Sequence, residues 1–440
     1  MITPKGRYFG IFNLMLITIF LTADQAALFP NYLLVENEFG VSHTEIGLIS
    51  SVFTIVAALA TLIWAYLVDK YSRKKLILIG VILGEIPCFL TGFVNDYTQL
   101  FVIRVLTGFG IGVILPAASS LLGDYFPSQE RGKGFGWFLS AMGFGYLLGA
   151  AIAGGIGSKF GWRYPFIIIA VPNFFLAPLF YLFVREPRRG ETDVQIKNSK
   201  GKDIVYNYPV KLSDFKKAVT IKTNLFLNLQ SILGCIPWGM LSSWIITFFV
   251  YVRGFSIPIA TTFALTFTGI RMFGNIWGGY IGDYLSRKKC VYRIILSITT
   301  ILLAIPFITA SISREISPHS DPSQFIIFFI LGFVGISLAS VAGPNSRAMF
   351  LDVNVPENRG MMLSFANLTD VMGTGIGPFF GGLLADRYGL FFALVTSILF
   401  WIPCALLWLP LIKALPVDMN DLSKIMKKRA SEILKKKKNK

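Results

Sequence analysis

Five charged residues interrupt long apolar stretches of the 440-residue sequence, and these are Asp24, Glu85, Arg104, Arg271 and Asp370. A charge in a hydrocarbon environment is costly, so an ionisable side chain kept there is a candidate for function by default. A carboxylate can take up and release a proton, and a nearby guanidinium favours its charged form or binds an anionic solute. The alternative is that these charges form ion pairs that have only a structural role inside each bundle. We interpret the five residues as candidates for substrate binding or proton coupling.

The apolar stretches themselves set the fold class. Hydrophobic residues make up 54% of the chain and charged residues 15%, and the mean hydropathy of +0.63 lies outside the range of soluble domains. A membrane-spanning helix needs about 20 mostly apolar residues. The sequence predicts an all-α integral membrane protein with twelve transmembrane helices, near residues 8–34, 44–67, 76–94, 98–122, 134–156, 163–184, 225–251, 257–281, 291–312, 324–346, 361–385 and 389–412.

Counting along these helices predicts which charges share a depth. At a rise of about 1.5 Å per residue, Asp24 lies roughly 24 Å along its helix from one membrane face, and Arg104 about 9 Å from the other face. The two residues are therefore expected at a similar level. The same count puts Arg271 and Asp370 near mid-depth, so two acid–base pairs could form. Glu85 has no evident partner, and it either takes part in coupling or faces a polar pocket.

The formal net charge of +17 is concentrated in two segments. Residues 185–222 hold ten Lys/Arg and five Asp/Glu, and residues 413–440 hold ten and three. Loops rich in Lys and Arg stay cytoplasmic, so a multi-pass protein of the cell membrane with both termini cytoplasmic is predicted. The basic excess is explained by topology and by anionic membrane lipid, and no nucleic-acid partner is expected.

The chain contains an internal duplication. The phrase VDKYSRKK at 68–75 returns as GDYLSRKK at 282–289, and Asp124 and Asp352 match at an offset of 228. Two pseudo-symmetric six-helix bundles are predicted, a design that transporters use to rock around a central site. The expected domains are a first bundle at 1–184, a linker at 185–222, a second bundle at 223–412 and a basic cytoplasmic tail at 413–440.

The repeated phrase resembles the Gly-x-x-x-Asp-x-x-x-Arg-Lys motif of the major facilitator superfamily, complete from Gly279 to Lys288 and with Ala65 in place of the first glycine. RVLTG at 104–108 is similar to that family's helix 4 pattern, and residues 22–53 resemble the start of its Spinster-like and organic-anion branches. The resemblance implies a secondary transporter, and no enzyme, that moves a small organic solute by alternating access. Anionic solutes are included in this expectation, and we expect the protein to act as a monomer. An exporter of lipids or amphipathic drugs is one alternative, and a non-transporting receptor or scaffold is another.

The duplicated aspartates, Asp69 and Asp283, are predicted to hold the cytoplasmic face shut by pairing with an arginine or a helix N-terminus of the opposite half. The expected gate comprises Asp69, Arg73, Arg131, Asp283, Arg287 and Arg359. The Arg-Lys runs could instead only fix the topology.

Small residues repeat every four positions on three predicted helices, at Gly145 and Gly149, at Gly274 and Gly278, and at Gly373, Gly377 and Gly381. Such faces let backbones approach closely. They serve either static packing or sliding between the halves, where helix 5 would meet helix 8 and helix 2 would meet helix 11.

Metal and ATP chemistry are not expected. The only histidines, His43 and His319, lie in predicted outer loops, and the sequence has no Gly-x-x-x-x-Gly-Lys-Ser/Thr phosphate loop. We predict no metal site and no cofactor, so an ion gradient, with H⁺ as the ion, is expected to supply the energy.

Overall fold

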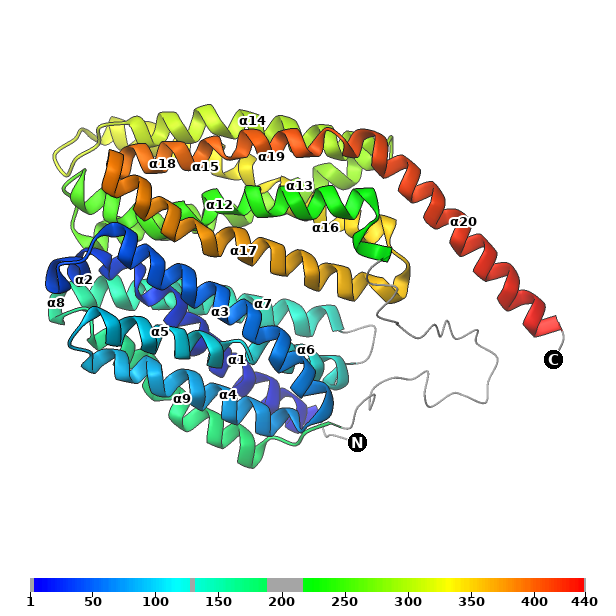
Figure 1. Cartoon of the computed structure of the whole chain (residues 1–440), viewed down its shortest axis with the longest axis horizontal. Helices are drawn as coiled ribbons and strands as arrows, with labels where there is room; N and C mark the ends of the chain where they lie inside the picture. Colours follow the sequence, from blue (N-terminus) through cyan, green and yellow to red (C-terminus); the bar gives the residue numbers. More distant parts are fainter. Residues whose placement is uncertain (1–3, 127–130, 188–216, 439–440) are drawn as a thin grey trace. The chain divides into compact units, whose positions relative to one another are not determined.

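The computed structural model describes residues 4–126, 131–187 and 217–438, which are helical apart from short connections (Figure 1). The helices of the first part of the chain are α1 (Pro4–Ala27), η1 (Phe29–Asn31), α2 (Tyr32–Phe39), α3 (His43–Lys70), α4 (Arg73–Leu90), η2 (Thr91–Phe93), α5 (Tyr97–Ile111), α6 (Ile114–Tyr125), α7 (Arg131–Ile152), η3 (Ala153–Gly157), α8 (Ser158–Phe160) and α9 (Tyr164–Phe183). Those of the second part are α12 (Lys222–Tyr251), α13 (Ile257–Ser286), α14 (Val291–Ser313), α15 (Pro322–Ser340), α16 (Ala342–Val353), α17 (Pro356–Tyr388), α18 (Leu390–Leu399), α19 (Trp401–Trp408) and α20 (Leu411–Lys438).

Ten helical segments of the described residues are long and apolar enough to cross a membrane. Helices α13 and α17, with 30 and 33 residues, are not among these ten. Both contain a predicted site charge, Arg271 in α13 and Asp370 in α17, which lowers their hydropathy. The all-helical membrane fold is therefore seen, whereas twelve crossings in two six-helix bundles remain a prediction.

Local sequence explains where several helices begin and end. Ser42 caps α3 in a capping box with Glu45, Ser72 caps α4 through the backbone N–H of Lys75, and Asp96 caps α5. Helix α2 ends at Gly40, whose φ of 64° most side chains would resist. The caps of α4 and α5 matter for the site because they fix where these helices present Arg73, Glu85 and Arg104, which are buried.

The chain divides into two compact units that do not follow the sequence halves. Unit 1 contains the described residues up to 187 together with Ser242–Leu265 and Pro378–Leu390. Unit 2 contains the described residues from 217 to 241 together with Thr266–Gly377 and the chain from Phe391 onward. Each unit is described by itself below. In unit 1 we call the end at which α9 finishes the linker end, in unit 2 we give this name to the end at which α12 begins, and the opposite ends are the loop ends.

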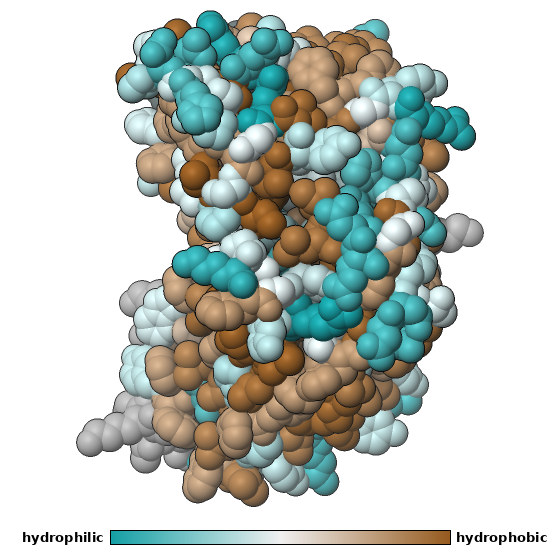
Figure 2. Space-filling view, turned by 90° about the vertical axis from the view of Figure 1, so that its left-hand side faces the viewer, coloured by the Kyte–Doolittle hydropathy of each residue, from teal (hydrophilic) through white to brown (hydrophobic). Residues whose placement is uncertain are grey.

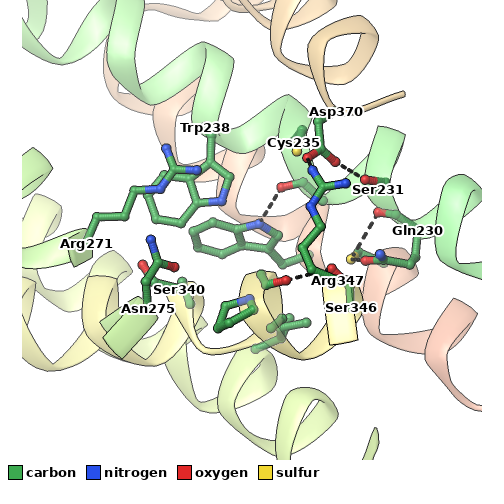
Figure 3. Close-up of a pocket in the computed structure, with 18 residues that line it drawn as sticks. Gln230, Ser231, Cys235, Trp238, Arg271, Asn275, Ser340, Ser346, Arg347 and Asp370 are labelled. Atoms are coloured by element: carbon green, nitrogen blue, oxygen red, sulfur yellow. Dashed lines mark hydrogen bonds and ion pairs between the residues drawn. The ribbon is translucent and has the colours of Figure 1, made fainter. Parts of the chain in front are cut away.

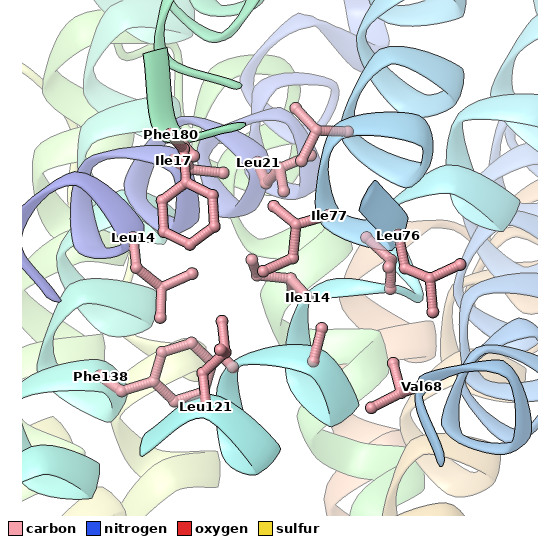
Figure 4. Packing of buried hydrophobic residues seen from close by; sticks show 14 of the residues in the cluster. Leu14, Ile17, Leu21, Val68, Leu76, Ile77, Ile114, Leu121, Phe138 and Phe180 are labelled. Atoms are coloured by element: carbon pink, nitrogen blue, oxygen red, sulfur yellow. The ribbon is translucent and has the colours of Figure 1, made fainter. Parts of the chain in front are cut away.

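In unit 1, α1 packs against α7 and α9, while α4 packs against α5 and α9 (Figure 1). Figure 4 shows the apolar cluster between them, in which Leu14, Ile17 and Leu21 of α1 face Ile77 of α4 and Phe180 of α9. In a bilayer such packing stabilises the fold through van der Waals contact, because lipid tails are as apolar as the core. In unit 2, α14 packs against α15, α16 and α19.

The predicted glycine faces pack within their own unit. A Cβ on Gly145 or Gly149 would collide with α1 at Ile19 and Ala23, and one on Gly274 or Gly278 would collide with the α15–α16 segment. Similarly, Gly373 and Gly377 lie against α12, and Gly381 is buried. The contacts of Gly145, Gly149, Gly274, Gly278, Gly373 and Gly377 are all with neighbouring helices of their own half, as static packing would give, and sliding between the halves stays a prediction.

Large exposed side chains on the helices are mostly apolar, as a lipid-facing surface requires; examples are Leu62, Ile79, Leu182 and Ile330. Figure 2 views the loop end, where α2 and α8 lie, and hydrophilic residues form patches there between areas of hydrophobic residues.

Candidate functional site

Asp24 of α1 and Arg104 of α5 form a buried ion pair in unit 1. Nη1 of Arg104 donates to Oδ1 of Asp24 at 2.6 Å, and the two side chains are 2% and 1% exposed. The guanidinium also lies over the ring of Phe53 at 4.4 Å. The structure thus brings together the two residues that depth counting had placed at one level.

A second buried carboxyl lies one turn of α4 from this pair. Cys88 donates its thiol to Oδ1 of Asp24 at 3.1 Å, and Glu85 precedes Cys88 by three residues on the same face. Oε1 of Glu85 accepts a hydrogen bond of 2.5 Å from Nδ2 of Asn173 on α9. The expectation that Glu85 lacks a partner is wrong, because Asn173, a neutral residue in a predicted span, was not considered. Glu85 is 1% exposed.

We call this group of residues the buried carboxyl cluster; it comprises Asp24, Glu85, Cys88, Arg104 and Asn173. Some of its buried polar atoms have no hydrogen-bond partner. Asp24 Oδ2, Glu85 Oε2 and Asn173 Oδ1 are buried acceptors with no hydrogen-bond donor. Within the cluster two carboxyl groups face one guanidinium, so full ionisation would leave one buried negative charge unbalanced. A bound proton removes that charge at the lowest cost.

Unit 2 contains a pocket of about 390 Å³ (Figure 3). Arg271 of α13 and Asp370 of α17, both predicted, line this pocket. The guanidinium of Arg271 lies 4.3 Å from the ring centroid of Trp238, a cation–π arrangement that holds it in place. Asp370 accepts hydrogen bonds from the hydroxyl of Ser231 and from Nη2 of Arg347.

Arg347 is the site residue that sequence reasoning missed. It belongs to α16, faces the same pocket and forms an ion pair with Asp370. The predicted span ended at residue 346, one position before it, so Arg347 was not counted as a charge inside a helix. The arginine at the edge of an apolar run was the signal that could have found it.

The far wall of the pocket is fixed by hydrogen bonds within the protein. Oε1 of Gln230 accepts from Nε1 of Trp408 at 3.0 Å, while its Nε2 donates to the Leu227 carbonyl at 2.9 Å. The polar lining also includes Arg271, Arg347, Asn275, Ser340 and Ser346. The pocket thus combines positive charge, hydroxyl and amide groups, and the indole of Trp238.

At the linker end of unit 1, Arg73 is a buried centre of charge pairing. Its Nη1 contacts Asp124, its Nε donates to Glu186 at 3.0 Å, and Nη2 donates to the Pro187 carbonyl at 2.5 Å. Burial of Glu186 opposes ionisation, but hydrogen bonds from Ser72 and from the backbone and side chain of Arg73, with the charge of Arg73, bring the pKa of Glu186 below its usual value.

The corresponding centre in unit 2 is Arg293, which binds Asp283 at 2.6 Å and Asp352 at 2.9 Å. Two expectations are corrected here. Arg287, aligned with Arg73 by the repeat, is exposed, and Arg293 instead binds Asp352, the residue aligned with Asp124. Asp283 pairs with α14 of its own unit rather than with the opposite half, because α13 and α14 form a tight hairpin.

The remaining predicted gate residues occupy varied positions. Asp69 is exposed near the end of α3, and Nε of Arg359 donates to the Asn354 carbonyl at 3.2 Å. The side chain of Arg131 lies outside the described residues. Within the described ranges, no three His, Cys, Asp or Glu side chains are placed to hold a metal ion.

At the loop end of unit 1, Asp386 of α17 caps the N-terminus of α3. Its carboxylate accepts from the backbone N–H of His43 at 3.0 Å and of Thr44 at 2.8 Å, and from the Thr44 hydroxyl. Nδ1 of His43 is 2.8 Å from Oε1 of Glu36. We call the contacts of Asp386 with His43 and Thr44 the loop-end latch; sequence reasoning missed them because Asp386 lies near the helix end, where a charge is ordinary.

Close backbone contacts surround the latch. A Cβ on Gly47 of α3 would collide with Pro378 of α17, and one on Gly382 of α17 would collide with His43. Trp244 of α12 donates to the Pro378 carbonyl at 2.9 Å. Likewise, Gly154 of η3 lies against Thr261 of α13. The second and eleventh predicted spans, now α3 and α17, therefore meet through Gly47, Pro378, Gly382 and His43. The fifth and eighth predicted spans meet through Gly154 and Thr261.

Known proteins share this architecture. A family model described as Major Facilitator Superfamily matches residues 14–343 and 259–437. The chain belongs to the major facilitator superfamily. It is therefore a transporter of a multi-span membrane class and not an enzyme, which confirms the resemblance seen in the sequence.

Individual members of the superfamily resemble this chain at moderate identity. The Hexuronate transporter of Bacillus subtilis (strain 168) is 22% identical over 84% of this chain and 85% of its own length. Multidrug resistance protein 1 of the same organism is 24% identical over 82% and 86%. The fold matches a bacterial homologue of the human lysosomal transporter Spinster, solved in an inward-facing, unoccupied conformation, with a TM-score of 0.82, 19% identity and coverage of 94% and 99%.

Proposed function

We propose that this major facilitator superfamily member is a secondary transporter that moves a small hydroxylated organic anion together with H⁺. The observation that carries the proposal is the unit 2 pocket, in which Arg271 and Arg347 approach one cavity with only Asp370 as an acidic lining residue. The pocket lining thus contains two cationic groups and one anionic group, a composition that favours a solute carboxylate.

The pocket chemistry fits a sugar acid. A carboxylate would bind the arginines, hydroxyl groups would bind Asn275 and the serines, and the ring would lie against Trp238. The name of the Hexuronate transporter agrees with this class of solute. A cavity of about 390 Å³ suits a molecule of that size rather than a lipid.

Through Asp370, substrate binding would change the conformational equilibrium of the protein. Because the Asp370 carboxylate already binds Arg347, a substrate carboxylate must compete with it for that guanidinium. A ligand shifts a conformational equilibrium only through differential binding, and exchange of one carboxylate for another supplies such a difference.

The buried carboxyl cluster would supply the proton coupling. Asp24 is neutralised by Arg104, whereas Glu85 has only the amide of Asn173. Glu85 is therefore the group that holds the proton in this conformation. Orientation with both termini cytoplasmic and action as a monomer are part of the same proposal.

Binding of candidate solutes to the purified protein tests the substrate class. We expect hexuronates to raise the thermal unfolding midpoint, R271Q and R347Q to abolish that shift, and R314Q, an exposed arginine outside the pocket, to retain it. Stabilisation by amphipathic cations, and not by sugar acids, would favour the drug exporter that the resemblance to Multidrug resistance protein 1 keeps open. Binding without transport would favour a receptor.

A further inference from the structure

Helix α20 has two chemically distinct faces. Leu415, Met419, Leu422 and Met426 follow one another at spacings of four, three and four residues, which aligns them in one stripe along the helix. Lys413, Lys424, Lys427 and Lys428 fall on the opposite side. A cationic helix with an apolar stripe is typical of segments that lie in a membrane surface.

The first turns of α20 are fixed to unit 2. Leu411 and Leu415 are buried, and α20 packs against α14, α16 and α19. Asp418 accepts a hydrogen bond of 2.9 Å from the backbone N–H of Thr223, at the start of α12. The direction in which α20 leaves the unit is therefore set by the protein.

Beyond Asp418 the character of the helix changes. Lys424, Lys427 and Lys428 are exposed, Lys424 with 68% of its side chain, and Ile425 is 45% exposed. Met419, Leu422 and Met426 are half-buried. Figure 1 shows α20 running on past the other helices of its unit toward the C-terminus.

Chain continuity places this segment at a membrane surface. The apolar span Leu390–Trp408 ends two residues before α20 begins, so α20 starts where the chain leaves the hydrocarbon. Residues 413–440 hold ten Lys/Arg against three Asp/Glu. A net positive, amphipathic segment at that position complements the negative charge of anionic phospholipid.

We propose that α20 beyond Asp418 binds anionic phospholipid on the leaflet beside the linker end. The stripe enters the boundary between headgroups and acyl chains, and the lysines pair with headgroup phosphates. This inference goes beyond the proposed transport function and does not depend on it.

Hydrogen–deuterium exchange of the full-length protein in vesicles tests the proposal. The backbone amides of 419–429 are expected to exchange about tenfold to a hundredfold more slowly in vesicles containing phosphatidylglycerol than in pure phosphatidylcholine, since three lysines act together. High salt should remove the difference. The variant K424Q/K427Q/K428Q should lose the slowing, and L422N/M426N should lose most of it.

The matched control is K75Q/K288Q/K289Q, which removes the same charge from three exposed lysines elsewhere. This variant should keep the lipid dependence. Equal exchange in the two lipids would overturn the proposal, and so would slow exchange in both lipids that persists in K424Q/K427Q/K428Q, because a protein contact would then cover the helix. An equal loss in the control would also overturn it, since net charge alone would then explain the effect.

Discussion

Oε1 of Glu85 lies 2.5 Å from Nδ2 of Asn173, and this neutral amide is the hydrogen-bond partner that the structure gives to a fully buried carboxyl group. Asp24, on the neighbouring helix, instead has the guanidinium of Arg104 at 2.6 Å. Two acids in one buried cluster therefore have different environments. Asp24 is paired with a cation, whereas Glu85 accepts its hydrogen bond from a neutral amide.

Replacing Glu85 by Gln should separate exchange from accumulation. E85Q resembles the protonated acid, so substrate exchange across the membrane, which needs no net proton movement, should continue. Accumulation driven by a pH gradient should fall to the level without a gradient. Counterflow and gradient-driven uptake in proteoliposomes measure the two processes, with E315Q, an exposed acid, as the control. Full accumulation by E85Q would move the coupling to Asp370 or Asp24.

Removing the latch carboxylate should open the loop end. Asp386 of α17 caps the N-terminus of α3, so its hydrogen bonds join these two helices. A hydrogen bond to a charged group contributes about 1.5–3 kcal/mol to stability. D386A should therefore increase modification of a cysteine placed at the buried Ser243 by at least about tenfold. D96A is the matched control, because Asp96 caps α5 locally through Gln99. Equal labelling in D386A and the parent would show that the latch does not hold this end closed.

The contribution of Glu186 to stability should depend on pH with a defined sign. Its pKa is lowered in the folded protein, chiefly through hydrogen bonds from Ser72 and Arg73 that outweigh the cost of burial. The stabilisation is therefore present above the unfolded value of about 4.3 and is lost as the pH falls through the lower folded pKa. The difference in thermal unfolding midpoint between wild type and E186Q should be constant from pH 7 to about pH 5 and shrink below it. A difference that grows on acidification would contradict this sign.

Part of the site follows from the sequence for a simple physical reason. Asp24 and Arg104 lie in regular helices, where a fixed rise per residue makes depth countable, and they do form a pair. Predicting the depth of a residue from its position in a span is less accurate at helix ends, because the end of the helix itself is uncertain. Arg347 lies one residue beyond a predicted span, yet α16 continues to Val353 and brings it to Asp370.

Repeats and glycine patterns identify types of contact but not their partners. The repeat aligned Arg287 with Arg73, whereas the short hairpin between α13 and α14 brings Arg293 to Asp283 and Asp352. A smooth glycine face permits close approach by any helix, so Gly149 gave no indication that it would meet Ala23. Such choices depend on the packing of the whole unit.

Transport by the purified protein tests the central claim most directly. Proteoliposomes with an inward proton gradient should accumulate radiolabelled hexuronate, with uptake collapsed by a protonophore, abolished in R347Q and retained in R314Q. Absence of uptake above that of empty liposomes across a panel of sugar acids, or unchanged uptake in R347Q, would contradict the account.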